Sequence, residues 1–143
     1  RPGYECRHNL LYWKAEEYIG VGAGAHSYMN GVRYNNIYDV ESYIDLIEVS
    51  PASLVENSQV ISKSEAISEF MILGLRLNEG ISSLEFRERF DEDLFELFGP
   101  RIEGLEKKGL ISVGSSGENR SDCRVALTEK GLDFANEVFI EFI

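Results

Sequence analysis

The sequence predicts an α+β fold in two parts: a front part of short strands, a hairpin and a helix, and a mainly helical second part. After residue 62, apolar side chains repeat at helical spacing, whereas glycines and a strong turn signal interrupt the first fifty residues. All seven tyrosines, the tryptophan and both histidines precede residue 44, and all eight phenylalanines follow residue 69. We therefore expect a domain over residues 1–50, a linker over residues 51–61 and a domain over residues 62–143.

The front part is expected to begin with a short strand over residues 18–21. Asn30-Gly31 is the strongest turn signal in the chain, and it separates an extended segment starting at Ser27 from a return strand over residues 32–34. Asp39 is then placed to cap a helix. The side chains that this helix is expected to bury are Val40, Tyr43, Ile44 and Ile47.

Capping and breaking signals define the helices of the second part. Two Ser-x-x-Glu patterns, starting at Ser62 and Ser82, predict helices that end near residues 80 and 90. Gly99-Pro100 is expected to open a third helix, which Gly109 ends.

The remaining residues predict a hairpin and a closing helix. Short apolar runs over residues 110–113 and 124–127 flank a stretch rich in Gly, Ser and Asn, which is typical of a hairpin with a loose tip. Thr128 can cap a single final helix that reaches Phe142. Three helices, a hairpin and a closing helix form a winged-helix-like order.

Charge argues against nucleic acid as a partner. The net charge is −11 with a pI of about 4.6, and residues 51–143 hold 10 basic against 18 acidic side chains. Binding to a duplex needs Lys and Arg to neutralise phosphates, so residues 100–108 are expected to be a packing helix and not a DNA-recognition helix. A winged-helix DNA-binding regulator and a protein-docking module remain the alternative functions.

Composition also limits membrane and cysteine chemistry. No apolar run approaches the roughly 20 residues that a membrane span needs, and we expect a cytoplasmic protein without a transmembrane segment. The chain opens at Arg1 with no leader-like pattern, so we expect residues upstream of it. Cys6 and Cys123 are far apart and are expected to be free thiols.

The segment from His8 to Trp13 combines a histidine, Asn9 and two aromatic residues, Tyr12 and Trp13. A histidine in such surroundings is most often a hydrogen-bonded structural group. A neutral imidazole is also a good iron ligand, and aromatic rings offer flat surfaces to a porphyrin. The residues by themselves leave both interpretations open.

A second segment is rich in glycine and small residues. Glycines let the backbone approach a ligand closely or adopt positive φ, so the segment is a candidate cofactor floor; its other interpretation is a tightly packed strand or bulge. A dinucleotide fingerprint is excluded, because the segment leads into a strand and not into a helix. Its candidate residues are Gly20, Gly22, Gly24, Ala25, His26 and Ser27.

Together, Arg1 to Asn9, Tyr12-Trp13, Gly20 to Ser27, and Arg33 followed by Asn36 resemble the oxygen-independent coproporphyrinogen III oxidase family, closest to its HemW-type heme-chaperone branch. The resemblance covers nearly the whole chain. Its specific parts are His-Asn-x-x-Tyr-Trp and Gly-Ala-His-Ser.

The resemblance implies a parent protein with a partial α/β barrel that holds a [4Fe-4S] cluster and S-adenosylmethionine, followed by a small helical domain. The first fifty residues would be the end of that radical S-adenosylmethionine barrel. By the same resemblance, His8, Asn9, Tyr12 and Trp13 form the heme motif, with His8 as candidate iron ligand, and Gly20 to Ser27 would face S-adenosylmethionine. The implied partners are heme or porphyrin and a heme-acceptor protein.

One departure from the family limits the chain itself. The family's cluster needs Cys-x3-Cys-x2-Cys, and this chain has two distant cysteines. We therefore expect these 143 residues to need no cofactor of their own and to be catalytically inert. Strands taken from a barrel leave unpaired edges, so a homodimer through such an edge is a further expectation.

Overall fold

The computed structural model describes residues 6–115 and 122–143 and divides the chain into two compact units. The first unit comprises residues 1–11 and 16–62, and the second comprises residues 12–15 and 63–143. The division passes through the first helix, α1 (Arg7–Trp13). Residues 1–5, quoted above for the family resemblance, and the predicted hairpin tip over residues 116–121 lie outside the described residues.

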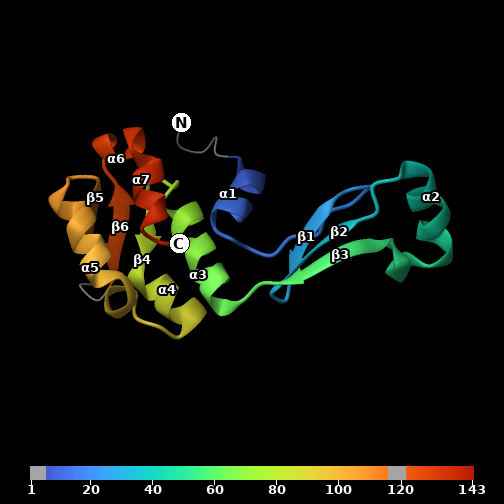
Figure 1. The fold of residues 1–143 in the computed structure, drawn as a ribbon, viewed down its shortest axis with the longest axis horizontal. Coiled ribbons are helices and arrows are strands. Elements are labelled where there is room, and N and C mark those ends of the chain that lie inside the picture. The colour runs from blue at the N-terminus through green and yellow to red at the C-terminus, as the bar shows by residue number, and fades with distance from the viewer. Residues whose placement is uncertain (1–5, 116–121) are drawn as a thin grey trace. The chain divides into compact units, whose positions relative to one another are not determined.

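A three-stranded antiparallel sheet forms the body of the first unit (Figure 1). Its strands are β1 (His26–Met29), β2 (Val32–Asn36) and β3 (Val55–Val60), in the order β1-β2-β3. The predicted hairpin is confirmed: Met29 pairs with Val32, and Asn30 and Gly31 have φ values of 51° and 72°. Both positive angles are those of a tight turn, which is why Asn-Gly is favoured there.

Two expectations for the first unit are wrong. Residues 18–21 form no strand, since Tyr18 makes only an isolated bridge to Tyr28. Residues 51–61 are not a simple linker, because a 3-10 helix η1 (Pro51–Leu54) leads into β3, which pairs along β2. Pro51 and the small and polar residues that follow it suggested a linker, but backbone hydrogen bonds to β2 decide the structure of residues 55–60.

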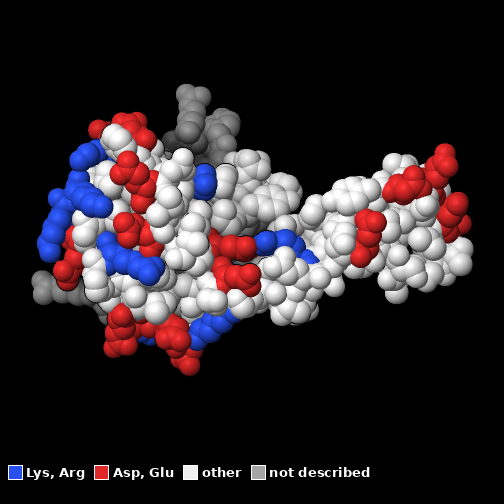
Figure 2. All heavy atoms as spheres, in the orientation of Figure 1, with Lys and Arg blue, Asp and Glu red and all other residues white. Residues whose placement is uncertain are grey.

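Helix α2 (Val40–Val49) forms where Asp39 predicted it, with the Asp39 carboxylate accepting from the Ser42 backbone N–H at 2.9 Å. The predicted burial of its apolar face is wrong. Val40 is 59% exposed and Ile44 60%, and no residue of α2 is buried. Acidic side chains gather over α2 in Figure 2, and the helix packs on η1 without burying any of its residues.

In the second unit, helices surround a second antiparallel sheet of order β4-β6-β5 (Figure 1). Its elements are α3 (Lys63–Gly74), β4 (Ile81–Ser82), α4 (Ser83–Phe90), α5 (Leu94–Lys107), β5 (Ile111–Ser115), β6 (Cys123–Leu127), α6 (Glu129–Asp133) and α7 (Ala135–Ile140). The predicted α+β class is therefore confirmed, with two small sheets that do not close into a barrel.

The core of the second unit is lined by phenylalanine rings. Phe70 meets Phe90 edge to face at 5.4 Å between ring centroids, and Phe98 meets Phe142 at 5.2 Å. Edge-to-face pairs add to the stabilisation that burial already supplies. The residues buried on α3 and directly after it are Ile67, Phe70, Met71, Gly74 and Leu75.

Helix α5 begins earlier than predicted. Asp93 caps it by accepting from the backbone N–H groups of Phe95 and Glu96 at 2.9 and 3.2 Å, and Pro100 lies inside the helix. Pro inside a helix costs about 3 kcal/mol because it removes a hydrogen bond. Burial of Leu94, the first residue of the helix, and of Phe98, one turn later, outweighs that cost.

The end of the chain also differs from the prediction. Thr128 caps α6 by accepting from the Gly131 N–H at 2.9 Å, as expected, but the single final helix is divided at Phe134 into α6 and α7. Val138 and Phe142 are buried as predicted, whereas Leu132 is 57% exposed. The break turns the apolar face of α7 toward the core.

Candidate functional site

Helix α1 carries all four residues of the predicted heme motif. His8 and Tyr12 are one helical turn apart, as are Asn9 and Trp13, so each pair shares a face of the helix. His8, Asn9 and Tyr12 are exposed, and Trp13 is half-buried. An exposed imidazole one turn before an exposed phenol ring is accessible to a flat, iron-containing ligand.

The end of α1 is a Schellman motif. The Glu16 N–H donates to the Leu11 carbonyl at 2.9 Å, and the Ala15 N–H donates to the Tyr12 carbonyl at 3.0 Å. Ala15 has a φ of 51°, a left-handed conformation that usually falls to glycine. This turn therefore holds an alanine at a conformational cost.

Residues 12–15 pack within the second unit, which the sequence did not indicate. The Arg89 guanidinium donates to the Lys14 carbonyl at 2.8 Å and to the Ala15 carbonyl. Arg76 places its guanidinium carbon 5.6 Å from the Trp13 ring centroid. Arg89 lies 75 residues from Lys14 along the chain, and Arg76 is similarly far from Trp13, so no local pattern could have shown the contacts.

The glycine-rich segment of the first unit is held mainly by Asn36. Its side-chain amide donates to the Gly22 carbonyl at 2.9 Å, and the Asn36 N–H donates to the Ala25 carbonyl at 2.9 Å. Ser27, which is 1% exposed, accepts from the Gly20 N–H at 3.0 Å. Buried polar groups are therefore satisfied inside the segment.

Two of the three glycines are explained by contacts within the chain. A Cβ on Gly20 would lie 2.2 Å from the His26 carbonyl oxygen, and one on Gly24 would lie 2.8 Å from the Tyr38 ring. Gly22 differs, because its φ is +113° and nothing lies within 4 Å of the position of a Cβ. Only Gly22 leaves room for a ligand to approach the backbone.

The described residues hold no cluster of three or more candidate metal ligands. No three His, Cys, Asp or Glu side chains gather as a metal site within residues 6–115 and 122–143. Cys6 and Cys123 are both free thiols. The donor set therefore does not fit a [4Fe-4S] cluster, while one exposed imidazole fits an axial heme ligand.

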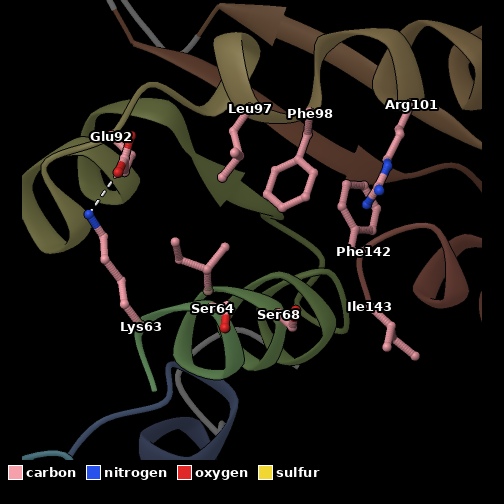
Figure 3. A pocket seen from close by; sticks show the side chains of 10 residues that line it. Lys63, Ser64, Ser68, Glu92, Leu97, Phe98, Arg101, Phe142 and Ile143 are labelled. Carbon is pink, nitrogen blue, oxygen red and sulfur yellow. Dashed lines mark hydrogen bonds and ion pairs between the residues drawn. The ribbon is translucent and has the colours of Figure 1, made fainter. Parts of the chain in front are cut away.

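The second unit has a pocket of about 480 Å³ between α3, α5 and the last residues (Figure 3). Apolar side chains such as Ile67 and Phe98 line it, and Lys63 donates to Glu92 at its edge at 2.7 Å. Arg101 reaches across the Phe98 ring and donates to the Glu141 carbonyl. None of the predicted site residues lines this pocket.

Comparison with known proteins identifies the family. A family model described as the HemN C-terminal domain matches residues 61–134. The chain belongs to this family. Within the part of the chain that the structure describes, no helix combines the length and apolar character needed to cross a membrane.

Relatives of this HemN-family chain are named heme chaperone HemW. The protein of Bacillus subtilis (strain 168) is 39% identical over 143 residues, which are 100% of this chain and 36% of that protein. The protein of Lactococcus lactis subsp. lactis (strain IL1403) is 36% identical over 142 residues, 99% of this chain and 35% of that protein. The chain therefore spans about a third of the length of these curated relatives.

A solved structure shares the fold of the HemN-family chain. Coproporphyrinogen III oxidase (HemN) from Escherichia coli, described as a radical SAM enzyme, matches with a TM-score of 0.61 over 89% of this chain and 28% of that chain. The identity is 16%, so this match supports the fold and not the activity.

Proposed function

We propose that the chain is the C-terminal part of a HemW-type heme chaperone and that α1 binds heme, with His8 as the iron ligand. The observation that carries the proposal is the exposed His8 imidazole, placed one helical turn before Tyr12, in a chain whose relatives are named heme chaperones. Bound heme would supply an iron atom, and the His8 imidazole would hold that iron through a ring nitrogen.

In the proposed heme site, His8, Tyr12 and Trp13 have different roles. The neutral His8 imidazole offers a lone pair, and its other ring nitrogen remains a hydrogen-bond donor that fixes the tautomer. Tyr12 presents an aromatic face on the same side of the helix. Trp13 is half-buried within the second unit, and we assign it to holding the helix in place.

The proposal places the remaining cofactors outside these residues. The longer protein would hold a [4Fe-4S] cluster and S-adenosylmethionine, with the first unit as the end of its partial barrel and Gly20 to Ser27 as a loop facing S-adenosylmethionine. Among those residues, Gly22 has the open space that such a loop needs. The second unit would be its winged-helix-like C-terminal domain.

The likeness to HemW also defines the expected setting. We propose a cytoplasmic protein that hands heme to an acceptor protein, and the free thiols of Cys6 and Cys123 are consistent with a reducing compartment. The relatives matched are heme chaperones, which favours this function over a DNA-binding regulator.

The experiment is a heme titration followed by Soret absorbance, with the chain's two histidines as a matched pair. His8→Ala should weaken heme binding by at least about a hundredfold, the upper end of what loss of an outer-sphere partner of a metal ligand costs. His26→Ala should bind heme as the unmodified protein does. His26 is also exposed, but it lies in β1 and contacts the Tyr38 hydroxyl at 3.4 Å.

Unchanged Soret binding by His8→Ala would remove His8 as the ligand. The radical SAM assignment is tested separately, by anaerobic reconstitution of the longer protein. Absence of iron-sulfur absorbance in that preparation would contradict the assignment and leave the heme result untouched.

A further inference from the structure

Helix α1 has little of its own to stabilise it. It is seven residues long, has no acidic residue in its first turn and no basic residue in its last turn, and buries no side chain fully. Isolated helices of this length are not stable in water, because nucleation costs more than a few hydrogen bonds return. The one-turn spacing of His8 and Tyr12 therefore depends on contacts outside the helix.

Arg89, near the end of α4, supplies such a contact at the C-terminus of α1. Its guanidinium donates to the carbonyl groups of Lys14 and Ala15, the two residues that follow the last helical residue. The C-terminal end of a helix carries partial negative charge and unpaired carbonyl groups, so a cation is favoured there. Arg89 thus replaces the basic residue that α1 lacks.

A second arginine packs against the same end. Arg76 has its guanidinium carbon 5.6 Å from the Trp13 centroid and 4.6 Å from the Phe139 centroid. Trp13 and Lys14 pack closely against residues of α3 and β4. The cavity between them has a volume of about 10 Å³, which is no larger than one water molecule. The Arg76 contact and this close packing hold Trp13 and Lys14 in place within the second unit.

We propose that Arg89 is a positioning residue of the heme site. It holds the last turn of α1, so that the helix persists and His8 and Tyr12 keep their common face. This inference rests on the proposed function for its heme readout. Its structural half, that Arg89 keeps α1 helical, can be measured without heme.

Arg89 also has contacts that concern stability alone. Its guanidinium lies 5.4 Å from the Phe70 ring centroid and 5.9 Å from that of Phe90. An effect of Arg89→Ala on heme binding must therefore be separated from a general loss of packing. Arg87 offers the matched control, because it lies on the same helix, is exposed and pairs with Asp93.

Arg89→Ala should weaken heme binding by about tenfold, the usual effect of losing hydrogen bonds to a charged group. It should also speed amide hydrogen exchange in residues 8–13 of the heme-free protein. Arg87→Ala should do neither. Arg89→Lys should recover part of the heme affinity and part of the exchange protection, because an ammonium keeps the positive charge but lacks the planar set of N–H donors of a guanidinium.

Ala15→Gly provides a rescue that leaves Arg89 untouched. Glycine adopts a φ of 51° without strain, so it strengthens the Schellman turn that ends α1. In the Arg89→Ala background, Ala15→Gly should restore part of the heme affinity and part of the exchange protection. If Ala15→Gly restores the stability of the Arg89→Ala variant but neither its heme affinity nor its exchange protection, Arg89 acts through packing.

The outcomes distinguish this inference from the proposed function. If His8→Ala loses heme and Arg89→Ala does not, the positioning role is wrong and the heme site stands. If His8→Ala keeps heme, the proposed function fails, and faster amide exchange in residues 8–13 of Arg89→Ala still shows that Arg89 holds α1. Unchanged exchange in residues 8–13 overturns the inference in either case.

Discussion

At the scale of single residues, backbone contacts decide which glycines of the second unit have no room for a side chain. A Cβ on Gly131 would lie 1.8 Å from the Leu110 carbonyl oxygen, the same oxygen that accepts from the Thr128 N–H. Gly104 in α5 has nothing within 4 Å of the position of its Cβ. The two glycines look alike in the sequence, and only their neighbours distinguish them.

Gly131→Ala should lower the free energy of unfolding by about 1–3 kcal/mol, because a methyl group forced against backbone must displace it. Gly104→Ala should raise it by about 0.5–1 kcal/mol, since alanine is favoured inside a helix. Thermal melting of the two variants checks both signs, with shifts of several degrees. Equal destabilisation by both would contradict the packing of α6 against Leu110.

At the scale of elements, the start of α5 depends on a charged cap. The pKa of Asp93 is lowered from its ordinary value, first because the Glu96 N–H and then because the Phe95 N–H donates to its carboxylate. A lowered pKa in the folded state means that the ionised cap stabilises the fold above the unfolded-state pKa of about 3.9. That contribution is lost as the pH falls through the folded-state pKa.

Asp93→Ala should cost about 1 kcal/mol at neutral pH, the usual cost of removing an N-cap. Asp93→Asn keeps a capping oxygen but cannot ionise, so its stability should depend less on pH below about pH 4 than that of the unmodified protein. Urea unfolding between about pH 2.5 and pH 7 measures the difference. Parallel pH profiles for the unmodified protein and Asp93→Asn would show that Asp93 does not titrate as a cap.

At the scale of the whole molecule, the first unit exposes apolar side chains that its own sheet does not cover. Val40, Ile44 and Ile47 lie at helical spacing on α2 and are 59%, 60% and 42% exposed. The chain spans about a third of the length of its curated relatives. On the proposal that the chain is part of a longer HemW-type protein, we expect the remaining residues of that protein to cover this face of α2.

Ile44→Asp tests that expectation in two settings. In the 143-residue chain, the variant should leave the melting temperature unchanged and reduce binding of an apolar dye, because the side chain is already exposed. In the longer protein, the same variant should be destabilised by more than about 2 kcal/mol, the cost of burying an unpaired charge or polar group. The same small effect in both settings would show that α2 stays uncovered.

Prediction from sequence succeeded where structure is decided locally. Asn30-Gly31, the caps at Asp39, Ser82 and Thr128, and the stop at Gly109 are each confirmed, because they depend on residues within a few positions. It was wrong where it expected a linker in place of β3, a later start of α5 and a buried apolar face on α2. Pairing with β2 decides β3, and whether α2 is covered depends on what packs against it after folding. The start of α5 is set locally by the Asp93 cap, and the Gly99-Pro100 pattern indicated the wrong position.

The sequence by itself determined the α+β class and the family resemblance, because residue type and spacing carry that information. The heme motif of His8, Asn9, Tyr12 and Trp13 stays a prediction drawn from that resemblance. Only the tertiary structure showed that Arg89 meets the end of α1, that Asn36 holds the glycine segment, and that Trp13 is half-buried. These contacts join residues distant in the chain. Their energies depend on which atoms come into contact after folding, and no pattern of neighbouring residues predicts those contacts.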